Sequence, residues 1–165
     1  MKIKFIIPGE PQGKARPRVV RMKSGRSMSY TPDKTVAYEE LVRQRFLAEA
    51  QGRRFADDTP IDIIITAFLG IPKSASKRKQ MLMTSGALFP MKKPDLDNVM
   101  KIVCDALNGI AYKDDAQIVN AKICKRWSSE MPSVWVTICG TEREGENDER
   151  KDCLLYTSDA ADDRI

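Results

Sequence analysis

The chain has 165 residues, of which 42% are hydrophobic and 31% are charged, and these values are typical of one soluble globular domain. It contains no histidine, which excludes Ser-His-Asp and Cys-His catalysis and zinc sites that need histidine ligands. No apolar run approaches the roughly 20 residues of a membrane span, so we expect a cytoplasmic protein that makes no membrane contact. None of the four cysteines forms a C-x-x-C pair, and we expect reduced thiols.

Positive charge is concentrated in two segments of a chain whose formal net charge is +5. Residues 71–93 contain no acid, and residues 13–34 contain only Asp33. The basic side chains of the two segments are Lys14, Arg16, Arg18, Arg21, Lys23, Arg26 and Lys34 in the first, and Lys73, Lys77, Arg78, Lys79, Lys92 and Lys93 in the second. Such blocks indicate a polyanionic partner, although charge alone is equally compatible with a solvated surface.

The elements of the first half are predicted from periodicity and from start and stop signals. Residues 2–7 alternate like an edge strand, and residues 9–30 form a long basic loop with room for a hairpin. The Thr31-Pro32-Asp33 sequence predicts a helix that begins with a Thr31 N-cap and ends at Gly52. Residues 60–69 are apolar on both faces, which predicts a central strand.

The second half contains two predicted helices, over 74–84 and 95–108, followed by two strands over 116–127 and 133–139 that we expect to pair. The buried stripe of the second helix is predicted to consist of Leu96, Val99, Met100, Val103 and Leu107, with Gly109 as its stop. The order of elements predicts an α+β fold in which helices pack on a small mixed β-sheet in a single domain.

The domain is expected to cover residues 1–140. Residues 141–152 contain no apolar side chain and are predicted to be a disordered end. Residues 153–165 resemble the translation of a transposase adapter that is used in preparing DNA libraries. We therefore interpret that segment as an artefact and exclude it from the prediction of the fold.

Acidic residues with chemical potential occur at two places. Asp95 and Asp97 open the helix over 95–108, where capping and the helix dipole explain them as well as a metal site does. Lys101 follows Asp97 by one turn and suits either an ion pair or a contact with phosphate. The pair Asp114-Asp115 fits a solvated turn, and the sequence does not establish that it lies near Asp95. Carboxylates of this kind are the ligands that Mg²⁺ uses in phosphodiester cleavage, with lysines to offset repulsion of DNA.

The ordered motifs resemble those of RusA-type Holliday junction resolvases over roughly residues 1–139. The resemblance rests on the segments 5–18, Tyr30-Thr31-Pro32, 93–98, Lys101, 105–109 and 114–118. It implies a homodimer that nicks opposed strands of four-way junction DNA with Mg²⁺, in recombination and repair. It also implies the roles of the site residues: Asp95, Asp97 and Asp115 as metal ligands, Lys101 as the catalytic lysine, and Asp114 as an alternative to Asp115.

The basic residues next to these motifs are expected to bind DNA, and they are Lys14, Arg16, Arg18, Lys92 and Lys93. One alternative is a nucleic-acid-binding module without catalysis, which explains the basic segments but not the ordered acids. A second is a Mg²⁺-dependent phosphotransferase for small molecules, but the glycine loop G-x-x-x-x-G-K-[ST] is absent from the sequence.

Overall fold

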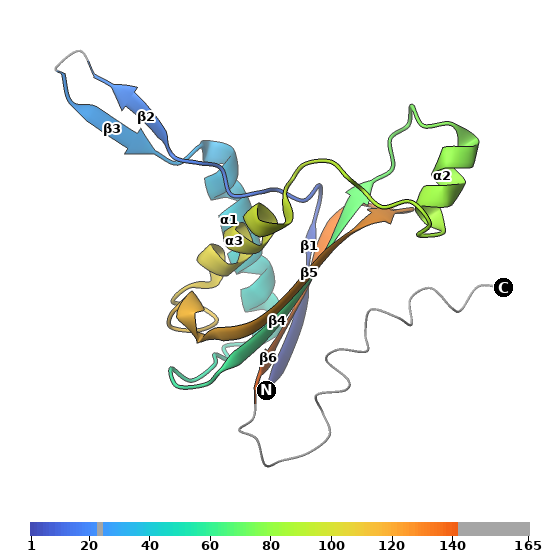
Figure 1. Ribbon diagram of the computed structural model, residues 1–165. Coiled ribbons are helices and arrows are strands. Elements are labelled where there is room, and N and C mark those ends of the chain that lie inside the picture. The colour runs from blue at the N-terminus through green and yellow to red at the C-terminus, as the bar shows by residue number, and fades with distance from the viewer. Residues whose placement is uncertain (23–24, 142–165) are drawn as a thin grey trace.

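A computed structural model shows an α+β fold in one domain, as predicted, and describes residues 1–22 and 25–141. Two long helices, α1 (Asp33–Ala50) and α3 (Leu96–Leu107), lie on one side of a four-stranded sheet (Figure 1). A short helix, α2 (Lys77–Thr84), lies away from them beyond one end of β4 (Ile61–Gly70) (Figure 1). The predictions for 153–165 and for all but the first residue of 141–152 fall outside the described residues.

The sheet is mixed, with the strand order β1-β6-β4-β5. Strand β1 (Lys2–Pro8) is an edge strand, as predicted, and pairs antiparallel with β6 (Ser133–Gly140). Strand β4 is central, also as predicted, since it pairs antiparallel with β6 and parallel with β5 (Ile118–Ser128). The chain passes from β4 to β5 through α2 and α3, the crossover that a parallel pair requires.

The expected pairing of the last two strands is wrong. Strands β5 and β6 are consecutive in sequence but are separated in the sheet by β4. The inward side chains Val134, Val136 and Ile138 of β6 are buried, which is consistent with the position of β6 between β1 and β4. Strand β5 carries polar residues along much of its length, such as Asn120 and Lys122, and such a strand tolerates the free edge.

Two helix starts and the burial of one helix residue differ from prediction. Pro32 has an extended backbone (ψ 138°) and occupies the N-cap position of α1 without a side-chain cap, so Thr31 is not the cap. Helix α2 begins at Lys77, later than expected, because the Ser76 hydroxyl accepts a hydrogen bond from the Lys79 N–H. Leu96 was expected in the buried stripe of α3 but is 37% exposed, since it lies at the first residue of the helix.

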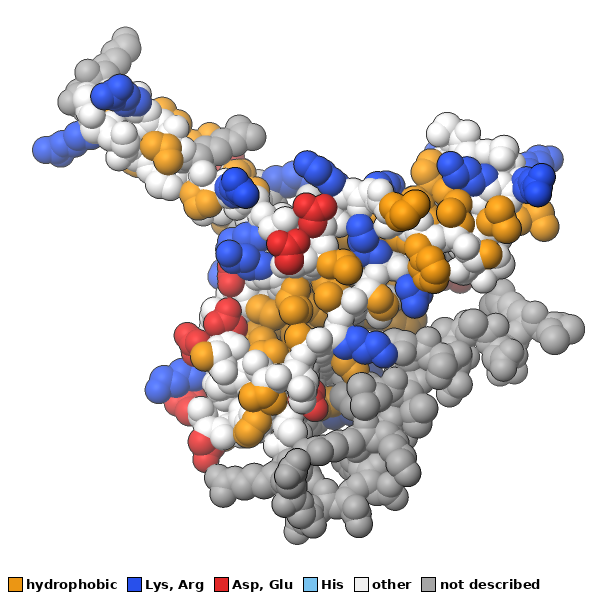
Figure 2. Space-filling view, viewed as in Figure 1, with side chains coloured by type: hydrophobic (Ala, Val, Ile, Leu, Met, Phe, Trp, Pro, Cys, Tyr) orange, Lys and Arg blue, Asp and Glu red, His pale blue; other side chains and the backbone are white. Residues whose placement is uncertain are grey.

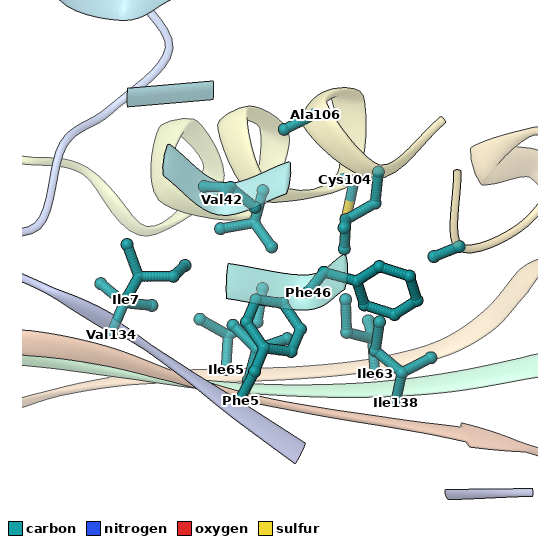
Figure 3. Close-up of a cluster of buried hydrophobic side chains, with 14 of the residues drawn as sticks. Phe5, Ile7, Val42, Phe46, Ile63, Ile65, Cys104, Ala106, Val134 and Ile138 are labelled. Atoms are coloured by element: carbon teal, nitrogen blue, oxygen red, sulfur yellow. The ribbon is translucent and has the colours of Figure 1, made fainter. Parts of the chain in front are cut away.

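The core fills the space between the sheet and the two long helices. Phe5, Ile65 and Val134 of the sheet approach Val42 and Phe46 of α1 (Figure 3). The rings of Phe5 and Phe46 meet edge to face at 5.7 Å between centroids. Helix α3 adds Val99, Ile102, Val103, Cys104, Ala106 and Leu107 to this core. One face of α3 is therefore fixed against the sheet, which leaves its polar face available.

The long basic loop contains the hairpin that the sequence allowed, formed by β2 (Arg18–Arg21) and β3 (Ser27–Tyr30). The hairpin projects from the body of the domain (Figure 1). Among the described residues, Cys104 and Cys124 are free thiols, and Cys153 lies outside them. None of the described helices is both long and apolar enough to cross a membrane.

Candidate functional site

The N-terminal end of α3 carries two exposed carboxylates without a protein partner. Asp95 occupies the N-cap position, but its side chain accepts no capping hydrogen bond, and Asp97 lies in the first turn. Within the described residues, neither carboxylate takes part in an ion pair or a hydrogen bond. The sequence allowed the Asp95 side chain to cap α3. In the structure this side chain does not cap the helix.

Lys101 lies one turn after Asp97, and its side chain is exposed. In the part of the chain that the structure describes, Lys101 and Asp97 form no ion pair. The spacing would allow such a pair, but exposed pairs of this kind contribute only about 0.3–0.5 kcal/mol. The ammonium of Lys101 is thus available for an anionic ligand beside Asp97.

Asp114 and Asp115 differ in what their side chains do. A carboxylate oxygen of Asp114 accepts a hydrogen bond of 2.9 Å from the Ala116 N–H and caps the short 3-10 helix η1 (Asp115–Gln117). Partial desolvation raises the pKa of Asp115, and the negative charges of Asp114 and Asp105 raise this pKa further. Asp114 therefore has a structural role, while Asp115 is an exposed carboxylate among like charges.

A single chain does not gather the three expected metal ligands in one place. Asp115 lies close enough to Asp105 to feel its charge, and Asp105 follows Asp97 by eight residues on α3. Eight residues of helix span about 12 Å. Among residues 1–22 and 25–141, no group of three or more His, Cys, Asp or Glu side chains is arranged to hold a metal ion. Asp95 and Asp97 lie at the start of α3, whereas the charges that act on Asp115 are those of Asp114 and of Asp105, further along that helix.

The basic loop passes directly beside the acidic end of α3. The Lys14 N–H donates a hydrogen bond of 2.8 Å to the Asn98 carbonyl. A Cβ atom on Gly13 would lie 3.0 Å from the Asn98 Cβ and 3.2 Å from the Pro94 Cβ, so this close approach favours glycine. The loop that carries Arg16 and Arg18 is thus anchored within a few residues of Asp95 and Asp97.

The side chain of Lys14 joins this loop to both long helices. Its ammonium pairs with Glu39 of α1 and lies 3.0 Å from a carboxylate oxygen of Asp105. Partial burial lowers the pKa of Lys14, but the hydrogen bonds and charges of Glu39 and Asp105 outweigh it, and the pKa is raised overall. A DNA phosphate would have to compete with two carboxylates for this ammonium.

We expect Lys14→Met to lower the free energy of unfolding by about 1–3 kcal/mol, because it leaves two partly buried carboxylates without their cation. The methionine keeps most of the alkyl stem, so the loss reports the ammonium. Urea unfolding measures it. The exposed Lys73→Met serves as the control, and equal stability of the two variants would contradict the structural role of Lys14.

Positive charge surrounds the acidic end of α3. Acidic side chains lie near the start of this helix, with lysine and arginine side chains around them and toward α2 (Figure 2). Lys92 and Lys93 are exposed immediately before Asp95, and Arg16 is exposed in the loop. The Lys92 ammonium lies 5.1 Å from the ring centroid of Trp127. This arrangement places cations where they can bind phosphates next to two acids.

The sequence interpretation missed the residue that anchors the approach to this site. Lys125 of β5 donates hydrogen bonds to the carbonyls of Lys92, at 2.6 Å, and Pro94, at 3.2 Å. A signal was present, since Lys125 lies between Ile123 and Trp127, two residues away on either side, and so falls on the inward face of its strand. Near the other end of α3, burial raises the pKa of the core residue Cys104 to about 11, which makes this thiol a poor nucleophile.

Two comparisons with known proteins bear on what this chain does. Residues 8–139 match the family that is described as Endodeoxyribonuclease RusA. The uncharacterized protein YqaN of Bacillus subtilis (strain 168) is 37% identical over 139 residues, which are 82% of this chain and 94% of that protein. The match includes the N-terminal loop, α3 and η1 in a single span.

Proposed function

Since the chain belongs to the RusA endodeoxyribonuclease family, we propose that it is a Mg²⁺-dependent nuclease that resolves four-way DNA junctions by paired nicks. In this proposal the protein acts as a homodimer in recombination and repair. The observation that carries the proposal is the pair of carboxylates, Asp95 and Asp97, which have no partner among the described residues and lie at the start of a helix that a basic loop flanks.

The donor set at the start of α3 fits a hard cation. Mg²⁺ keeps several waters and is commonly held by one or two carboxylates together with substrate phosphates. Asp95 and Asp97 would hold it. When bound, the cation polarises the phosphodiester and lowers the pKa of a coordinated water. Lys101, on the same helix, would bind the phosphate and offset its charge, and Lys92 and Lys93 would bind the neighbouring backbone.

Asp115 remains the proposed third ligand, and its position sets a condition on that role. Among the described residues, no group of three or more acidic, His or Cys side chains is arranged to hold a metal ion, and the charges that act on Asp115 are those of Asp114 and Asp105. Asp115 would reach the cation after a movement of residues 113–117, or from the second copy of the proposed dimer. We infer Asp115 rather than Asp114 because Asp114 is engaged in capping η1.

A cleavage assay tests the proposal directly. The purified protein is incubated with a synthetic four-way junction and with a linear duplex of the same sequence, in Mg²⁺ or in chelator. We expect paired nicks in the junction with Mg²⁺ alone, and little cleavage of the duplex. Tight junction binding without cleavage in Mg²⁺ or Mn²⁺ would instead support the non-catalytic nucleic-acid-binding module.

The arginines of the basic loop are expected to control affinity rather than chemistry. We expect Arg16→Ala with Arg18→Ala to weaken binding to all junction sequences alike, because contacts with phosphate carry no base information. The slope of log affinity against log salt should fall by roughly 2, since each lost contact contributes about 0.9. Fluorescence anisotropy over a salt series measures this slope.

A matched double variant separates this effect from a general loss of charge. Lys2→Ala with Arg54→Ala also removes two cations, from exposed positions outside the loop. We expect its salt slope to remain near that of the wild type. An unchanged slope in the Arg16 and Arg18 variant would assign these arginines to another role.

A further inference from the structure

The segment between α2 and α3 has few backbone anchors of its own. Within the described residues, residues 89–94 make no backbone–backbone hydrogen bond, although they lead directly into Asp95. Met91 in this segment is 91% exposed. Something else must therefore set the path of the chain into the N-terminal turn of α3.

Three consecutive side chains of the edge strand β5 supply these anchors. The Arg126 guanidinium lies 4.9 Å from the ring centroid of Phe89, and the Trp127 ring lies under the Lys92 ammonium. Lys125 binds the carbonyls of Lys92 and Pro94. Of the three contacts, only that of Lys125 reaches the residue immediately before Asp95. Its hydrogen bonds are charge-assisted and therefore stronger than bonds between neutral groups.

The opposite side of Pro94 is also covered. Gly13 packs against Pro94 and Asn98, and the Lys14 N–H binds the Asn98 carbonyl. The start of α3 is thus held between the basic loop and β5. Because the Asp95 side chain does not cap its own helix, the direction of its carboxylate follows from the path of the backbone through Pro94. Lys125 fixes that path.

We propose that Lys125 is a positioning residue for the Asp95–Asp97 site: its ammonium fixes the two carbonyls before Asp95 and holds both carboxylates where they bind a divalent cation. This inference rests on the proposed function, since it assigns Lys125 to the same site. Lys125 itself does not need to touch DNA or metal in this role.

The test compares Lys125→Met, Lys125→Arg and Lys122→Met. Lys122 lies on the same strand but on its other face, so Lys122→Met controls for the loss of a lysine from β5. The first readout is amide hydrogen exchange of the metal-free protein at Val99, whose N–H donates to the Asp95 carbonyl. The second is the Mg²⁺ concentration for half-maximal junction cleavage.

For Lys125→Met we expect exchange at Val99 to become about tenfold faster, a factor typical of losing hydrogen bonds from a charged donor. Exchange at the central Ile65 should stay unchanged. The half-maximal Mg²⁺ concentration should rise about tenfold, on the same energetic basis, with a smaller loss of rate at saturating Mg²⁺. Lys125→Arg, which keeps a charged donor, should restore most of both readouts, and Lys122→Met should match the wild type.

Wild-type values for Lys125→Met in both readouts, in a protein with normal circular dichroism, would overturn the proposal. If Lys125→Met does not fold, Lys125→Gln is tested with the same readouts and decides in its place. The exchange experiment requires no catalysis. A wild type that cleaves no junction would therefore reject the proposed function, whereas normal cleavage with an unaltered Lys125→Met would reject only the role of Lys125.

Discussion

Replacing Asp97 by asparagine is expected to abolish junction cleavage while junction binding stays unchanged or becomes tighter. Asparagine keeps the shape of the side chain but removes the charge that would hold the cation. Metal catalysis supplies several kcal/mol of transition-state stabilisation, and a loss of about 4 kcal/mol corresponds to a rate about 10³-fold lower. Binding should not suffer, because a negative charge is removed from a surface that binds a polyanion.

Gel assays of cleavage and of binding, in Mg²⁺ and in Ca²⁺, measure these two effects separately. Asp58→Asn is the matched control, since Asp58 is also an exposed aspartate but lies outside α3. The melting temperature of Asp97→Asn should stay near that of the wild type, because the Asp97 carboxylate has no ion-pair or hydrogen-bond partner within the described part of the chain. Full activity of Asp97→Asn in Mg²⁺ would remove Asp97 from the list of ligands.

The sequence predicted most elements of this fold but not the arrangement of the last two strands. Periodicity reports which side chains of an element face inward, as it did for β4 and, in α3, for Val99, Val103 and Leu107. It does not report which strand is the neighbour of which, because strand pairing joins positions that are far apart in the sequence. The position of β6 between β1 and β4 is a property of the whole sheet.

The same limit applies to the candidate site. Asp95, Asp97 and Lys101 follow from local helix geometry, which the sequence contains. The contact of Lys14 with Asp105 and that of Lys125 with Pro94 join positions far apart in sequence, and their formation depends on how α3 packs. Only the inward position of Lys125 on its strand was available in advance.

The remaining acids provide the second large prediction. We expect Asp115→Asn to lower the cleavage rate at least about 10²-fold, since about 2.7 kcal/mol of metal-dependent stabilisation is lost. Asp114→Asn should keep nearly full activity, because asparagine caps a helix about as well as aspartate does and the N–H of Ala116 keeps its acceptor. Cleavage rates in Mg²⁺ and melting curves of both variants test this difference, and the opposite order would make Asp114 the ligand.

Stability and subunit mixing show how Asp115 would act. Its carboxylate lies among the like charges of Asp114 and Asp105, so Asp115→Asn should leave the melting temperature equal or raise it, and a rate loss could not then be attributed to unfolding.

Mixing inactive Asp97→Asn and Asp115→Asn chains tests where the carboxylate comes from. If a ligand from one copy completes the site of the other, each mixed dimer contains one intact site and nicking returns. If all ligands come from one chain, both sites of the mixed dimer are defective and no activity returns. We expect recovered nicking, which would place the third ligand on the second copy, whereas no recovery would favour a movement of residues 113–117 within one chain.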